Sequence, residues 1–148
     1  DGFCLDIVGF APHQRLDLPL IAHNCKAGVY KDQAVTMTAE GYVVFVAFQK
    51  CLTAIAPHTR ALPGNPLMAI NCNEHSDFLQ SQPLQRFEFT ATQQLRLQNS
   101  DLCLAVGATS DQTSASTHRW RNLFLDYCDE IKPALSQWRF VAAQASPL

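Results

Sequence analysis

Charged residues and long apolar runs are both scarce in this sequence. Only 16% of the 148 residues are charged, and the formal net charge is −2. A chain without a basic excess is poorly suited to neutralising phosphates, so we expect no nucleic-acid partner. No apolar run approaches the roughly 18 residues that indicate a transmembrane helix, so we expect no membrane insertion. Because 47% of the residues are hydrophobic, we predict a single globular domain over residues 1–148.

The motifs of common enzyme classes are also missing. The sequence has no Gly-x-Ser-x-Gly nucleophile motif, no glycine-rich phosphate loop and no His-Glu-x-x-His metal motif. It contains only six glycines, so glycine-rich phosphate-binding loops are not expected. The histidines are scattered through expected loops: His13, His23, His58, His75 and His118. We therefore predict a protein that is not an enzyme and that holds no cofactor and no metal ion.

Six cysteines are present, and their spacing is regular. They fall into three pairs with intervals of 21, 21 and 25 residues: Cys4 and Cys25, Cys51 and Cys72, Cys103 and Cys128. Six cysteines allow 15 pairings, but the similar intervals favour three local disulfides. Each would close a loop and contribute about 3 kcal/mol. The alternative is six buried free thiols in a reducing compartment. The sequence contains no Cys-x-x-Cys pair, the spacing typical of zinc and redox sites.

A pattern of about 50 residues occurs three times around these cysteines. Each copy has Cys-Leu at its first cysteine and a short apolar run before its second. A third run follows at residues 33–37, 85–89 and 136–140, with hydrophobic residues two apart, which is the period of a half-buried strand. Further strands are predicted at residues 42–48 and 94–98. The nearest approach to a helical pattern is residues 114–125.

These features predict an all-β fold. Short strands in three repeats, at about residues 1–48, 49–99 and 100–148, indicate a β-trefoil with one disulfide per repeat, with a β-sandwich as the alternative. With Cys-Leu-x-x, the paired cysteines and Gln85-Arg86-Phe87 in phase, the chain resembles the ricin B-type (R-type) lectin domains over nearly its whole length. The resemblance implies a secreted or periplasmic, non-catalytic lectin for galactose- or N-acetylgalactosamine-type glycans.

The resemblance places the sugar site in the first repeat. The family positions there are occupied by Asp6, by His23 at the aromatic position, and by Asp32 and Gln33. A carboxylate accepts hydrogen bonds from sugar hydroxyls, an aromatic ring packs on sugar C–H groups, and an amide both donates and accepts. The alternative interpretation is structural: Asp6 caps a turn, and Asp32 and Gln33 hold the repeat together.

The other two repeats lack this set of residues. Repeat two has Thr53 and Ile70 at the positions of Asp6 and His23, and repeat three has Ala105 and Asp126. Ser136 replaces the glutamine of repeat three. Both repeats are therefore predicted to have lost the sugar site.

The sequence also leaves little room for a twelfth strand, because only eight residues follow Phe140. We expect that strand to be missing or to be supplied by a protein partner or a second copy that covers the open edge. The first residue is Asp1, which predicts a processed chain or an excised domain. The alternative function is a non-catalytic structural or assembly subunit without sugar binding, for example a receptor-binding subunit of a toxin-like complex.

Overall fold

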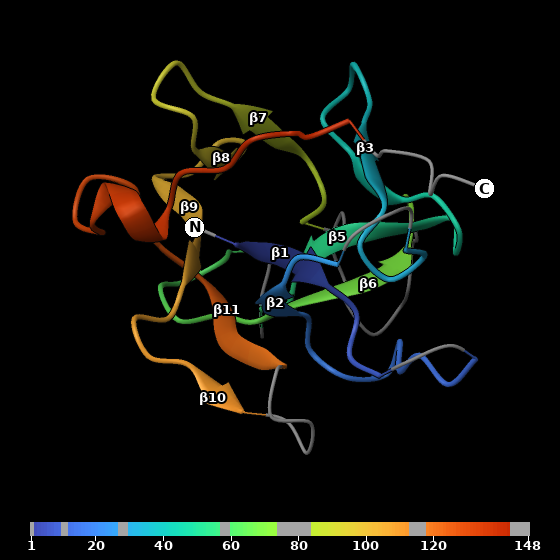
Figure 1. Ribbon diagram of the computed structural model, residues 1–148. Helices are drawn as coiled ribbons and strands as arrows, with labels where there is room; N and C mark the ends of the chain where they lie inside the picture. The colour runs from blue at the N-terminus through green and yellow to red at the C-terminus, as the bar shows by residue number, and fades with distance from the viewer. Residues whose placement is uncertain are drawn as a thin grey trace.

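The computed structural model describes residues 2–9, 12–26, 30–56, 60–73, 84–112 and 118–142 (Figure 1). Within these ranges the chain forms strands and one short 3-10 turn but no α-helix, which confirms the all-β prediction. The elements are β1 (Phe3–Asp6), β2 (Ile21–Asn24), β3 (Val35–Met37), β4 (Val43–Phe45), β5 (Lys50–Ala54), β6 (Leu67–Asn71), β7 (Phe87–Phe89), β8 (Leu95–Leu97), β9 (Leu102–Val106), β10 (Asp111–Gln112), β11 (Arg119–Tyr127) and η1 (Pro133–Leu135). A search of the described residues for a helix long and apolar enough to cross a membrane finds none.

Three antiparallel strand pairs share one register. They are β1 with β2, β5 with β6, and β9 with β11. In each pair the first cysteine stands opposite the residue two positions before the second cysteine: Cys4 opposite His23, Cys51 opposite Ile70, Cys103 opposite Asp126. Because side chains alternate along a strand, this register brings both cysteines of a pair to one face. The sequence repeat is therefore also a repeat of strand pairing.

All six cysteines are joined in disulfides. The bonds are Cys4–Cys25, Cys51–Cys72 and Cys103–Cys128, each with a Cα–Cα distance of 5.0 Å. This confirms the three local bridges and rules out the free-thiol alternative. Disulfides of this number are typical of proteins from oxidising compartments.

The leucine after each first cysteine explains why Cys-Leu recurs. Leu5, Leu52 and Leu104 are all buried in one hydrophobic cluster, together with Phe45 and Phe87. Alternation along the strand turns each leucine to the face opposite its cysteine. One face of each strand pair is thus held by a disulfide, while the other contributes to a core shared by the three repeats.

Two shorter hairpins extend these pairs. β3 pairs with β4, and β7 pairs with β8. The strands form one sheet in the order β1-β2-β11-β9-β8-β7, with β10 beside β11, and a second in the order β3-β4-β5-β6. In Figure 1 the strands curl around a common centre rather than forming flat layers.

One local prediction was wrong in the last repeat. Residues 136–140 were expected to form a strand, but they make only an isolated bridge between Gln137 and Gln94. The backbone N–H of Trp138 donates to Gln93 O, and its indole Nε1 donates to Leu104 O. The segment therefore lies beside Gln93 and Gln94, which precede β8, and has no hairpin partner among the described residues. Residues 143–148 lie outside the described ranges.

The segment considered for a helix is mostly a strand. Residues 119–125 belong to β11, and residues 114–117 lie outside the described ranges. Leu123 and Leu125 are buried, while their neighbours are partly or fully exposed. This two-residue period matches a half-buried strand, and pairing with β2 and β9 on its two sides decides the conformation.

Candidate functional site

The residues predicted to bind sugar meet at the end of β1. Asp6 is the last residue of β1, and Asp32 and Gln33 lie in the turn that precedes β3. The backbone N–H of Ile7 donates to Asp32 O at 3.1 Å, which ties this turn to the end of the strand. Asp6 and Asp32 are only 2% and 3% exposed. The structure thus brings three of the four predicted residues together, but it buries both carboxylates.

The amide of Gln33 is committed to internal hydrogen bonds. Its Nε2 donates to Asp6 Oδ2 at 2.5 Å and to Asn24 O at 3.2 Å. Its Oε1 accepts from the backbone N–H of Lys26 at 3.0 Å. Because a glutamine amide has only two N–H donors, none remains for a ligand.

Lys26 covers the two carboxylates. Its Nζ forms an ion pair and hydrogen bond with Asp32 Oδ2, and it lies 3.7 Å from Asp6 Oδ2. Asp32 Oδ1 is buried and has no hydrogen-bond partner among the described atoms. Burial raises the pKa of Asp6 to about 7; the hydrogen bond from Gln33 lowers it, the charge of Asp32 raises it, and Lys26 lowers it. Lys26 was not among the predicted site residues, although its place directly after a cysteine was visible in the sequence.

His23 does not offer an open ring face for sugar. The side chain is 8% exposed, and its Nδ1 lies 2.9 Å from Asn24 O, so Nδ1 is the donor. The ring meets that of His118 edge to face, with the centroids 5.2 Å apart. His23 connects to Gln33 through Asn24 O, which accepts from both side chains.

Repeat two contains the same arrangement without acids. Gln85 Nε2 donates to Thr53 Oγ1 at 3.0 Å and to Asn71 O at 2.7 Å, and Gln85 Oε1 accepts from Asn73 N at 2.7 Å. Thr53 and Asn71 hold the positions relative to the cysteines that Asp6 and Asn24 hold in repeat one. Gln33 and Gln85 therefore both close their repeats through the same three contacts.

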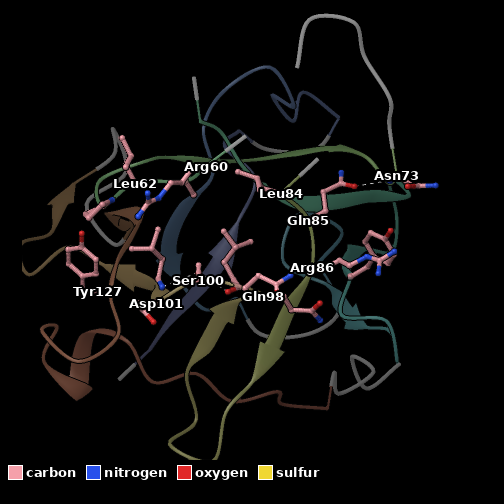
Figure 2. A pocket seen from close by; sticks show the side chains of 16 residues that line it. Arg60, Leu62, Asn73, Leu84, Gln85, Arg86, Gln98, Ser100, Asp101 and Tyr127 are labelled. Atoms are coloured by element: carbon pink, nitrogen blue, oxygen red, sulfur yellow. Dashed lines mark hydrogen bonds between the residues drawn. The ribbon is translucent and has the colours of Figure 1, made fainter. Parts of the chain in front are cut away.

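An open groove lies elsewhere on the molecule. It has a volume of about 710 Å³, within the range of small-molecule sites. Its lining comes from residues 60–63, 84–86 and 97–102, together with Tyr42, Asn73 and Tyr127. Figure 2 shows Tyr127 and Leu62 toward one end and Arg86 and Asn73 toward the other, with Gln98, Ser100 and Asp101 along one wall.

Several polar groups of this groove are free to meet a ligand. Arg60 and Asp101 are exposed, Tyr127 is 42% exposed, and their side chains make no hydrogen bond or ion pair with the described part of the chain. Gln98 is anchored, because its Nε2 donates to Phe87 O at 3.1 Å. The guanidinium of Arg86 lies over the ring of Tyr42, 5.5 Å from the centroid.

Gly41 permits the close contact that forms the Tyr42 end of the groove. Its φ of +100° is in the left-handed region, and Phe87 N donates to Gly41 O at 2.8 Å. A Cβ at this position would lie 2.3 Å from Phe87 O. Only glycine combines this conformation with such an approach. The hairpin of repeat one can therefore contact β7 and place Tyr42 beside Arg86.

Sequence reasoning missed the groove because its residues come from all three repeats, and only Gln85 and Arg86 among them belong to a motif that the sequence showed. Among the described residues, no group of three or more His, Cys, Asp and Glu side chains could hold a metal ion. His58 and His75 lie outside those residues. Comparison of the chain with protein-family models, curated proteins and solved structures gave no match.

Proposed function

We propose that the chain is a non-catalytic carbohydrate-binding domain with the β-trefoil fold of ricin B-type lectins, secreted into an oxidising compartment. The matching register of the three strand pairs and the matching contacts of Gln33 and Gln85 support a threefold repeat. The three disulfides support the location. Galactose and N-acetylgalactosamine are the first ligands to test, because the sequence resemblance implies them.

The groove is the proposed sugar site, and one observation carries this choice. Arg60, Asp101 and Tyr127 present an exposed guanidinium, carboxylate and phenol ring in one hollow. Hydroxyl-rich ligands need donors, acceptors and an aromatic face together. At the repeat-one cluster, a sugar would first have to displace Lys26 from Asp32 and Gln33 from Asp6.

Substitution of groove residues is expected to weaken glycan binding. A single shallow site has an affinity of about 1 mM, so an immobilised multivalent glycan array is the suitable measurement. Tyr127→Ala removes the aromatic face and Asp101→Asn removes the charged acceptor. Each is expected to weaken binding roughly tenfold, because such contacts contribute about 1 kcal/mol or more.

Tyr30→Ala is the matched control for this experiment. Tyr30 is 47% exposed, lies outside the groove and contacts Lys26 beside the repeat-one cluster. It is expected to leave binding unchanged. Loss of binding in Tyr30→Ala but not in Tyr127→Ala would move the site to repeat one. Absence of binding to every sugar on the array would contradict the lectin proposal.

A second candidate function is that of an assembly subunit, and an exposed apolar patch favours it. Phe89 and Phe140 are 41% and 47% exposed and meet edge to face with centroids 5.8 Å apart, and the adjoining Val141 is 72% exposed. The patch includes the end of the segment that lacks a hairpin partner among the described residues. Such a patch suits a second polypeptide that adds a strand.

Sedimentation velocity tests this second candidate. The purified chain is expected to self-associate or to form a stable complex with a co-expressed polypeptide, and Phe140→Ser is expected to weaken that association at least tenfold. Tyr30→Ala is the control, because it removes an exposed aromatic ring outside the patch. Phe48→Ser would be unsuitable, because Phe48 packs against the core. A monomer at all concentrations, without any complex, would contradict the subunit function.

A further inference from the structure

The groove is more positive than the chain to which it belongs. The whole chain carries a net charge of −2. Among the groove residues, Arg60 and Arg86 are positive and Asp101 is negative, which leaves one net positive charge. Both arginines are exposed, and neither makes an ion pair within the described part of the chain. Their guanidinium groups are therefore available to an anion.

Arg86 is held in position for such a contact. Its guanidinium packs on the ring of Tyr42, which restricts the side chain without neutralising it. Glu40 is the acidic neighbour from the adjoining turn. The pKa of Glu40 is lowered mainly by a bond to its own backbone and by Thr38, and the charge of Arg86 contributes least. The two side chains form no ion pair within the described part of the chain.

We propose that the groove selects an acidic saccharide, whose carboxylate or sulfate groups are bound by Arg60 and Arg86. This proposal rests on the proposed glycan function and names the class of glycan. A guanidinium binds a carboxylate or sulfate through two parallel N–H donors, a geometry that an ammonium group does not offer. The carboxylate of Asp101 and the side-chain amide oxygen (Oε1) of Gln98 remain as acceptors for the hydroxyl groups of the same ligand. Recognition of an inorganic anion alone would leave these acceptors unused.

Matched neutral and acidic sugars test the proposal by calorimetry or ligand-observed NMR on the whole, disulfide-bonded chain. Galactose is compared with galacturonic acid, and N-acetylgalactosamine with its 6-sulfate, so that each pair differs in one anionic group. The acidic member of at least one pair is expected to bind about tenfold more tightly. The preference is expected to shrink as the NaCl concentration rises from about 0.05 to about 0.5 M.

Two arginine variants and one control assign the contacts. At least one of Arg60→Gln and Arg86→Gln is expected to weaken binding of the acidic sugar roughly tenfold, with little effect on the neutral sugar. Arg139→Gln removes the same charge from an exposed residue outside the groove and is expected to change nothing. Far-ultraviolet circular dichroism and thermal melting identify any variant that fails to fold, and the other arginine variant then carries the test.

The outcomes separate this inference from the proposed function. Equal binding of neutral and acidic sugars, unchanged in both arginine variants, overturns the acidic preference but leaves a lectin. Equal binding of inorganic sulfate and the sulfated sugar overturns saccharide recognition at the arginines. Binding of none of these ligands contradicts the proposed function and the inference together. The carboxylate and sulfate pairs show which anion the groove prefers.

Discussion

Replacement of Gln85 by leucine is expected to lower the free energy of unfolding by about 3 kcal/mol. The side chain is 1% exposed, and its amide joins Thr53, Asn71 and Asn73. Leucine has a similar size but no polar atoms, so the change opens no large cavity but removes the hydrogen bonds to Thr53 Oγ1, Asn71 O and Asn73 N, of which Thr53 is fully buried. Each buried polar group left without a partner costs about 1–3 kcal/mol. Urea unfolding with the disulfides intact measures the loss.

Gln137→Leu is the matched control for Gln85→Leu. Gln137 is exposed, and its amide makes one hydrogen bond, from Nε2 to Thr92 O at 3.2 Å. Its loss is expected to change stability by no more than about 0.5 kcal/mol. If Gln85→Leu lowered the free energy of unfolding as little as this control, the hydrogen bonds of Gln85 would not be what stabilises repeat two.

The protein is expected to lose stability as the pH rises from about 4 to about 7, and Asp6 is the cause. Its pKa rises from 3.8 to about 7 on folding, mainly through burial. The folded state therefore holds a proton that the unfolded chain has released in this interval, so stability is greatest below about pH 4 and falls with rising pH. A difference of about three pKa units corresponds to a contribution of about 4 kcal/mol.

Asp6→Asn isolates this contribution. Asparagine keeps an oxygen that accepts from Gln33 Nε2 but does not ionise. The difference in unfolding free energy between the variant and the parent is therefore expected to grow by about 4 kcal/mol between pH 4 and pH 7. Lys26 and Asp32 are present in both proteins, so their effects largely cancel. Asp17→Asn, at an exposed aspartate paired with Arg15, is expected to keep the parent's pH slope. A parallel slope in Asp6→Asn would show that Asp6 is ionised in the folded state.

The disulfides and most strands were predictable because their signals are local. Equal cysteine intervals and two-residue alternation depend only on positions along the chain, and the structure confirms the three bridges and the strands at residues 35–37, 43–45, 87–89 and 95–97. Residues 136–140 have the same alternation but form no strand. Alternation indicates which side chains can be buried, whereas a strand also needs a neighbour with which to pair.

The chemistry of repeat one was predicted only in part. The sequence indicated that Asp6, Asp32 and Gln33 belong together, and the structure places them in contact. It did not indicate that Lys26 would cover both carboxylates, because one lysine after a cysteine carries no periodic signal. The groove was not predictable either, since Arg60, Arg86 and Asp101 come together only when different repeats pack.

The sequence by itself determined that this chain is an all-β protein with three cysteine pairs at repeating intervals. Both the two-residue alternation of apolar side chains and the cysteine intervals depend only on positions along the chain. Only the tertiary structure decided which polar groups a ligand can reach. Inside repeat one, Asp6 is buried and accepts a hydrogen bond from Gln33, so neither side chain is available to a ligand. Arg60 and Asp101, by contrast, are exposed at the groove. The physical reason is that accessibility depends on what packs above a residue, and that neighbour is usually distant in sequence.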